Sequence, residues 1–267
     1  MTHDFLKTLD AFDNATSSRR DAIRKAGRLG ANAALAALPL FASSKSAVAR
    51  SSGPDGDAEI LNYALTLGYL KRFFYEAALK NSALGIPDSD RPLFEEISAN
   101  ENAQVEFLSE VITDLERTPV VFEANDFDFT AGGTYDLDDY DTFLTLSQSF
   151  EDLGQRAYKG QAARIETAAI LTAALQIHSV MARQAAAVRR LRGNQGWIPN
   201  NQPGAAVPAI YAGEENVIQG NVDLSTSLPG VGTLYTVEQI TEAFDEPLSM
   251  EDVTNEDGTG IADPFFA

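Results

Sequence analysis

The feature that most limits the fold is a stripe of side chains in segment 94–115. Its members, which step alternately by three and four residues, are Phe94, Ile97, Glu101, Gln104, Leu108, Val111 and Leu115. This spacing places them on one face of an α-helix. The stripe is apolar at both ends, but a carboxylate and an amide interrupt its middle. Because a polar pair in a helix seam costs free energy unless it is hydrogen-bonded or binds something, we expect Glu101 and Gln104 to lie at a site inside a helical bundle.

Three other segments show the same helical spacing, so four long helices are predicted. Their ranges are 57–80, 91–115, 140–163 and from just after Glu166 to about Arg192. We expect Asp57 to cap the first helix and Gly193 to end the fourth. The connections are short, long and short; the long one, 117–139, has no helical period and includes an extended piece at 120–122. This all-α pattern is typical of the ferritin-like four-helix bundle with one long crossover.

The two ends of the chain differ in character from the bundle segment, 50–193. Residues 1–49 contain the basic pair Arg19-Arg20, an apolar stretch at 29–41 and the small-x-small sequence Ala47-Val48-Ala49. They resemble a twin-arginine export signal, although Ala22 and Ile23 replace the usual Phe-Leu. An amphipathic basic helix of the mature protein is the alternative. We expect export to the periplasm or cell exterior and no membrane span in the mature chain, because the apolar stretch is shorter than the roughly 20 residues that a span needs.

Residues 194–267, at the C-terminal end of the chain, are rich in proline. They predict an irregular C-terminal extension that packs on the bundle, with one short helix over 236–243 capped by Thr236. No second core is expected in this extension.

Charge and residue usage exclude several classes of function. The formal net charge is −19, which disfavours nucleic acid and anionic membranes as partners. The chain has no cysteine and only two histidines, His3 and His178, so thiolate sites and the usual nucleophile–base pairs are excluded.

Several separated segments point to a narrower group. They are 60–70, 150–160, 181–193 and 243–248, with the sequences ILNYALTLGYL, FEDLGQRAYKG, MARQAAAVRRLRG and AFDEPL. They resemble the exported ferritin-like domain family that includes plant desiccation-related proteins. The resemblance implies a bundle in which two helices each supply a glutamate, and two others each supply Glu-x-x-His, to a pair of metal ions.

The sequence departs from that ligand pattern at most positions. The residues that stand where the family's ligands would be are Gly68, Glu101, Gln104, Glu151, Met181 and Gln184. Only Glu101 and Glu151 are retained. An amide oxygen is a weak metal donor, and two carboxylates do not neutralise two divalent ions in a bundle interior. The sequence therefore predicts that the di-metal centre has been lost, with no catalytic residue and no cofactor.

Three interpretations of the remaining glutamates stay open. The first is a hydrogen-bonded plug in which Gln104, Gln184 and the hydroxyl of Tyr75 or Tyr158 hold carboxyls that burial keeps protonated. The second is a residual iron or manganese site formed by Glu101, Glu151 and His178, although a structural or surface role also suits His178. The third is a small molecule or a water cluster bound in the vacated cavity.

The acidic crossover raises a separate question about calcium. Its aspartates are Asp126, Asp128, Asp136, Asp138, Asp139 and Asp141. They lack the spacing of a calcium-binding loop, so solvated acidic turns are the preferred interpretation.

These observations favour a non-catalytic structural, interaction or stress-related protein of the cell envelope over an enzyme. The alternatives are a metal-dependent oxidase or iron-handling protein, and a small-molecule binding protein. We expect the partner to be a second copy of the chain or another envelope protein.

Overall fold

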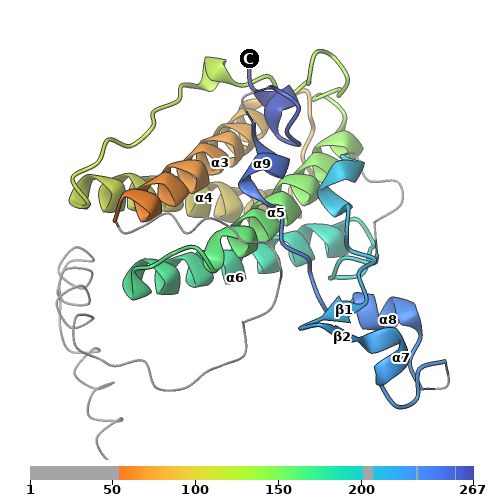
Figure 1. Cartoon of the computed structure of the whole chain (residues 1–267). Helices are drawn as coiled ribbons and strands as arrows, with labels where there is room; N and C mark the ends of the chain where they lie inside the picture. Colours follow the sequence, from red (N-terminus) through yellow and green to blue (C-terminus); the bar gives the residue numbers. More distant parts are fainter. Residues whose placement is uncertain (1–53, 201–206, 233, 256) are drawn as a thin grey trace, which may run out of the picture.

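The computed structural model describes residues 54–200, 207–232, 234–255 and 257–267. Its four long helices are α3 (Pro54–Lys80), α4 (Arg91–Asp114), α5 (Tyr140–Ala162) and α6 (Ala168–Leu191). They lie side by side as a bundle (Figure 1). The predicted all-α bundle with one long crossover is confirmed. The predicted signal, 1–49, lies outside the described residues.

Two apolar clusters fill the bundle. Along α4, Glu101 lies between the residues of one cluster and the residues of the other. One cluster contains Phe94 and Ile97 and is dominated by aromatic rings, including the pair Phe94–Phe143 at a centroid distance of 4.7 Å. The other contains Val105 and Leu108 and is mainly aliphatic. Helix α3 packs along α4, and α5 packs along α6. The polar middle of the α4 stripe is therefore enclosed by core on both sides.

The start of α3 corrects one prediction. The helix begins at Pro54 rather than at Asp57, and the Asp57 side chain is fully buried. Its carboxylate accepts the backbone N–H groups of Glu166 and Thr167, each at 2.9 Å. Asp57 therefore does not cap its own helix. It binds the two residues that immediately precede α6 and so joins the start of α3 to the start of α6.

The crossover between α4 and α5 runs from Leu115 to Asp139 and contains only the short 3-10 turn η1 (Ala124–Asp126) in its described structure. The predicted extended piece at 120–122 is not part of a sheet. Instead, the backbone N–H of Val120 donates to Asn62 on α3 at 2.8 Å. Asn62 therefore fastens the crossover to the bundle.

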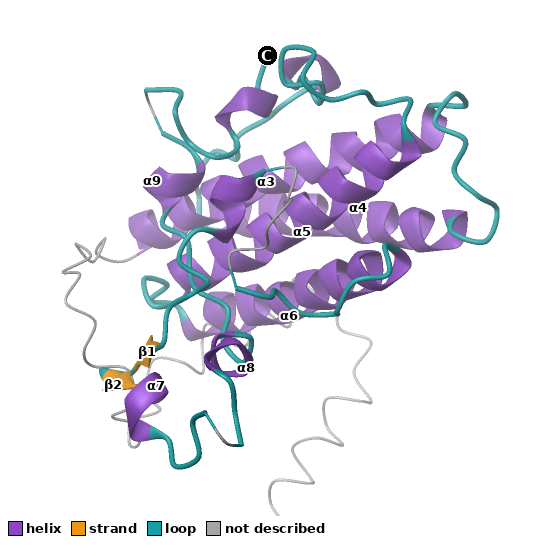
Figure 2. Ribbon diagram, turned by 90° about the vertical axis from the view of Figure 1, so that its right-hand side faces the viewer, coloured by secondary structure: helices purple, strands orange, loops and turns teal. Residues whose placement is uncertain are grey.

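The C-terminal extension follows the bundle in short elements. They are η2 (Pro208–Tyr211), β1 (Ile218–Gln219), β2 (Val222–Asp223), α7 (Leu224–Ser227), α8 (Val237–Thr241), α9 (Met250–Val253) and η3 (Asp263–Phe265). Elements η2 and α9 pack on α5, and Phe265 of η3 stacks edge-on against Phe150. The hairpin β1–β2 with α7 and α8 projects from the bundle (Figures 1 and 2).

The predicted wrap is confirmed for the parts that join the bundle core, and the predicted short helix corresponds to α8 with its Thr236 cap. The hairpin was not predicted. Within the described residues, no helix combines the length and the apolar composition that crossing a bilayer requires.

Candidate functional site

The centre of the bundle is an ion cluster formed by three helices. The ammonium of Lys71 on α3 lies 2.8 Å from Oε1 of Glu101 on α4 and 3.1 Å from Oε2 of Glu151 on α5. The side chain of Lys71 is 2% exposed and both glutamates are fully buried. The two carboxylates that the sequence singled out therefore do face each other, with a lysine between them.

Tyr75 completes this cluster from the next turn of α3. Its hydroxyl donates to Oε1 of Glu151 at 2.9 Å, and its ring stacks on Phe94. Both oxygens of Glu151 are thus bound by protein groups. By contrast, Oε2 of Glu101 is buried without a protein partner. The two carboxyls are therefore not equivalent.

Burial and the neighbouring charges set the protonation of this cluster. Burial raises the pKa of Glu101 to about 7, against the opposing effect of the Lys71 ammonium. Burial alone would lower the pKa of Lys71, but the attraction of Glu101 and Glu151 outweighs it and the pKa is raised. Lys71 is therefore charged at neutral pH. Loss of the Glu101 proton adds one negative charge to the cluster.

Gly154 makes room for Met181 beside the lysine. A Cβ atom at this position of α5 would lie 3.5 Å from Nζ of Lys71 and 3.1 Å from Sδ of Met181. The 3.1 Å distance is tighter than an ordinary contact, so the missing side chain lets Met181 lie beside the cluster, whereas the distance to the ammonium is an ordinary van der Waals contact. Met181 occupies one of the predicted former ligand positions.

The residues at this centre do not fit a pair of divalent ions. The space between the two glutamates holds a fixed positive charge, which repels a cation. The other predicted former ligand positions supply a thioether, two amides and a glycine, which are weak donors or none. In the described part of the chain, no three His, Asp or Glu side chains gather in a group that would hold a metal ion.

The amides do not hold the carboxyls as predicted for a hydrogen-bonded plug. Gln184 is buried, and neither its amide nitrogen nor its amide oxygen has a protein partner. Oε1 of Gln104 is also buried without a protein partner. Of the two tyrosines considered, Tyr75 provides the predicted hydroxyl contact. Tyr158 is buried nearby. Burial raises the pKa of its hydroxyl, and the charge of Glu101 raises that pKa further. The plug is therefore an ammonium–carboxylate cluster, not an amide–carboxyl one.

His178 and Gly68 lie apart from the contacts of the cluster. Burial lowers the pKa of His178, and the charges that act on it are those of Lys159 and Asp245. Gly68 lies against α4, where an added Cβ would meet Val105 at 3.1 Å. The correspondence of Gly68 to a former ligand stays a prediction.

Lys71 is the functional residue that the sequence reasoning missed. The second stripe of the first helix contains Leu61, Ala64, Gly68 and Tyr75. Lys71 lies three residues after Gly68 and four before Tyr75, so it belongs to the same stripe. A charged residue on an inward stripe was therefore a readable signal. It was overlooked because lysine usually lies at the surface.

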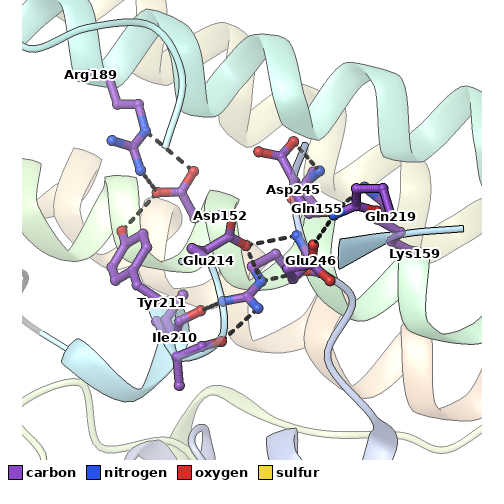
Figure 3. A network of polar contacts seen from close by, with 12 residues as sticks. Asp152, Gln155, Lys159, Arg189, Ile210, Tyr211, Glu214, Gln219, Asp245 and Glu246 are labelled. Carbon is purple, nitrogen blue, oxygen red and sulfur yellow. Dashed lines mark hydrogen bonds and ion pairs between the residues drawn. The ribbon is translucent and has the colours of Figure 1, made fainter. Parts of the chain in front are cut away.

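A second buried polar network fastens the extension to α5 (Figure 3). Asp152 accepts hydrogen bonds from Arg189 on α6 and from Tyr211 on η2, the latter at 2.7 Å. Arg156 pairs with Glu214 at 2.8 Å and donates to the backbone carbonyl of Ile210. These charges are buried and paired, which holds η2 against the bundle.

The same network reaches the last part of the extension. Gln155 donates to the Asp245 carboxylate at 2.8 Å, and Lys159 donates to the Asp245 carbonyl. Gln219 of β1 donates to Glu246, which joins the hairpin to this segment (Figure 3). One face of α5 therefore organises the extension, and another face carries Glu151.

The crossover aspartates form turns and caps. Asp128 accepts from the backbone N–H and hydroxyl of Thr130, Asp126 accepts from the backbone of Glu123, and Asp139 caps α5. These contacts place Asp126, Asp128 and Asp139 in turns and at a helix cap, as the preferred interpretation expects.

Comparison with protein families identifies a related domain. A family model described as a ferritin-like domain matches residues 56–194, which include the Lys71 cluster and all of α4, α5 and α6. A search of curated proteins found no match.

Proposed function

The chain belongs to the ferritin-like domain family, and on that premise we propose that it is a non-catalytic member of the family in which Lys71 replaces the metal ions. The observation that carries this proposal is the position of the Lys71 ammonium, 2.8 Å from Glu101 and 3.1 Å from Glu151. A tethered cation occupies the position between the two carboxyls in which a metal ion would have to lie.

The cluster is suited to holding the bundle together rather than to chemistry. Its three charged side chains are at most 2% exposed, and they bind one another. Tyr75 takes the remaining oxygen of Glu151. A substrate would have to displace these contacts and separate charges in the bundle interior, which is costly.

We place the protein in the cell envelope, as a structural, interaction or stress-related component. The twin-arginine pattern at Arg19-Arg20 supports export. The projecting hairpin and its neighbours expose large apolar side chains, including Ile218, Val222 and Val237. Such exposure supports contact with a second copy or with another envelope protein.

Elemental analysis tests the loss of the metal centre. The protein is expressed with iron, manganese and zinc supplied, and purified without chelator. We expect less than one ion per ten chains and an unfolding midpoint that EDTA leaves unchanged. One or more ions per chain, lost on Glu101→Ala, would refute the proposal and support the residual metal site.

A restorative variant tests the register of the former ligands. It combines Lys71→Leu with Gly68→Glu, Gln104→His, Met181→Glu and Gln184→His. We expect this variant to take up divalent metal, whereas Lys71→Leu alone does not form a stoichiometric site. A folded variant that stays metal-free would contradict the assigned positions.

Export is tested separately on the full chain. Replacing Arg19 and Arg20 by lysine should leave the protein in the cytoplasm of a host with a twin-arginine translocase. Unchanged export of this variant would refute the assigned signal.

A further inference from the structure

We propose that the centre of the bundle binds an internal water molecule, which hydrogen-bonds the Glu101 carboxyl and the Gln184 amide and so joins α6 to the Lys71 cluster. The inference rests on the proposed function, since Lys71 and not a metal ion supplies the positive charge at this centre. The ion pairs of Lys71 connect α3, α4 and α5 only. The water would add the fourth helix to the same polar layer.

The register of α5 and α6 places Gln184 near the height of Glu151. Gly154 and Met181 face each other, since a Cβ atom on Gly154 would lie 3.1 Å from Sδ of Met181. The two helices pack along each other after a short connection, so they run in opposite directions. Glu151 precedes Gly154 by three residues, and Gln184 follows Met181 by three. Because three residues are about one helical turn, both side chains lie on the facing surfaces at a similar height.

Helices α4 and α6 also run in opposite directions. Lys71 pairs with Glu151, whereas Asp57, earlier on α3, binds Thr167, just after α5. Helix α3 is therefore antiparallel to α5. Since α3 is also antiparallel to α4, and α5 to α6, α4 must be antiparallel to α6.

The register of α4 and α6 leads to Gln184 a second time. Leu108 of α4 and Ile177 of α6 line the same pocket. Two turns toward the start of α4 lead from Leu108 to Glu101, and two turns toward the end of α6 lead from Ile177 to Gln184. The two registers agree to within about one turn. Gln184 is therefore the residue that α6 presents to the ion cluster.

The polar atoms at this height lack hydrogen-bond partners among the described residues. They are Oε2 of Glu101 and both amide atoms of Gln184. Glu101 is fully buried and Gln184 is 6% exposed. Oε1 of Gln104, one turn from Glu101 on the same face of α4, is in the same state. Buried groups of this kind are normally satisfied by protein or by an ordered water.

Hydrogen-bond chemistry selects a molecule that both donates and accepts. Oε2 of Glu101 and Oε1 of Gln104 accept, whereas Nε2 of Gln184 donates. A water molecule donates to the two oxygens and accepts from the nitrogen, which gives the roughly three hydrogen bonds of a typical buried water. A direct bond between Gln184 and Glu101 would leave the Gln104 oxygen unsatisfied.

Charge excludes an ion at the same place. The Lys71 ammonium would repel a cation, and the carboxylates of Glu101 and Glu151 would repel an anion. A neutral water also suits both protonation states of Glu101, whose pKa burial raises to about 7. It donates to the carboxylate and accepts from the protonated carboxyl, without any movement of the helices.

A high-resolution crystal structure of the wild-type protein tests the site directly. We expect one density peak about 2.7–3.2 Å from Oε2 of Glu101 and from the Gln184 amide. The peak should give no anomalous signal at the absorption edges of iron, manganese and zinc. A direct hydrogen bond between the two side chains, with no peak, would overturn this inference and leave the proposed function intact. A peak with a metal's anomalous signal would overturn both, so the two failures are distinguishable.

Matched variants count the water in solution. Gln184→Met keeps the length of the side chain but removes its hydrogen-bonding groups, and Gln176→Met makes the same change at an exposed position of α6. Oxygen-17 relaxation dispersion of the solvent reports how many water molecules a protein holds in its interior. Gln184→Met should lower that number by about one, whereas Gln176→Met should leave it at the wild-type value. Equal numbers in the two variants would overturn the inference. The crystal structure of the wild type decides the question if Gln184→Met does not fold.

Discussion

The carboxylate of Asp57 accepts the backbone N–H of Thr167 at 2.9 Å and so joins the start of α3 to the start of α6. The same side chain accepts the N–H of Glu166, also at 2.9 Å. These two residues immediately precede α6, where N–H groups lack partners within the helix and a negative charge is favoured. One buried side chain thus closes the bundle at its aliphatic end, beside the short α5–α6 connection.

Asp57→Ala should lower the free energy of unfolding by about 1–3 kcal/mol, because two buried donors lose their acceptor. Glu59→Ala on the exposed face of the same helix is the control, with an expected change within about 0.5 kcal/mol. Urea denaturation followed by circular dichroism measures both. Equal stabilities for the two variants would show that the Asp57 contacts contribute nothing.

Lys71→Met should cost about 3–5 kcal/mol, because it leaves two buried carboxyls without their cation. Adding Glu101→Gln and Glu151→Gln to this variant removes the uncompensated charges and should recover most of the loss. The same urea titration measures the recovery. A Lys71→Met protein as stable as the wild type would mean that the ammonium does not support the bundle.

The pKa of Glu101 predicts that stability falls as pH rises. The carboxyl has a pKa of about 7 in the folded chain and 4.5 as its ordinary value. Between these pH values the folded state holds more protons than the unfolded state. The contribution of Glu101 to the free energy of unfolding is therefore complete below pH 4.5 and is lost as pH rises to about 7. The groups that act on this carboxyl are Lys71 and Glu151, with Tyr158 nearby.

Glu101→Gln isolates this effect from other groups, such as Glu214, whose pKa burial also raises to about 7. The wild type should lose more stability between pH 5 and pH 7.5 than the variant does. Urea titrations at the two pH values give the comparison. Parallel losses in the two proteins would assign the pH dependence to other groups.

The sequence predicts the long helices well because their seams repeat at a helical period. Helix α4 was predicted over 91–115 and runs from Arg91 to Asp114. Glu101 and Glu151 were predicted to lie in the interior, and both are fully buried. Periodicity reports which side chains face inward, and that was sufficient for these positions.

Periodicity does not report which inward groups meet across helices. The ion pairs of Lys71 span 30 and 80 residues of the chain, and the Asp57 contact to Thr167 spans 110. The attachment of the extension likewise depends on Arg156, which contacts residues more than 50 positions away. Such partners follow from tertiary packing, so the carboxylates that Lys71 binds and the role of Asp57 emerge only from the structure.

Gly160→Ala separates the contribution of the extension from that of α5 itself. Gly160 lies near the end of α5, and a Cβ atom there would overlap the carbonyl oxygen of Leu248. The Leu248 N–H donates to the Arg156 carbonyl at 3.1 Å, so the extension lies directly on the helix backbone. Helix propensity alone predicts that the substitution stabilises α5 by about 1 kcal/mol. The steric overlap predicts the opposite, a net loss of about 1–3 kcal/mol.

Hydrogen exchange measured by mass spectrometry distinguishes these outcomes for Gly160→Ala. Displacement of Leu248 should accelerate exchange in the extension around α9, because its backbone contacts to α5 are broken. Amides of α3 and α4 should keep their protection, since the Lys71 cluster is untouched. A variant that is more stable than the wild type, with unchanged exchange around α9, would show that the extension does not press on α5 at this glycine.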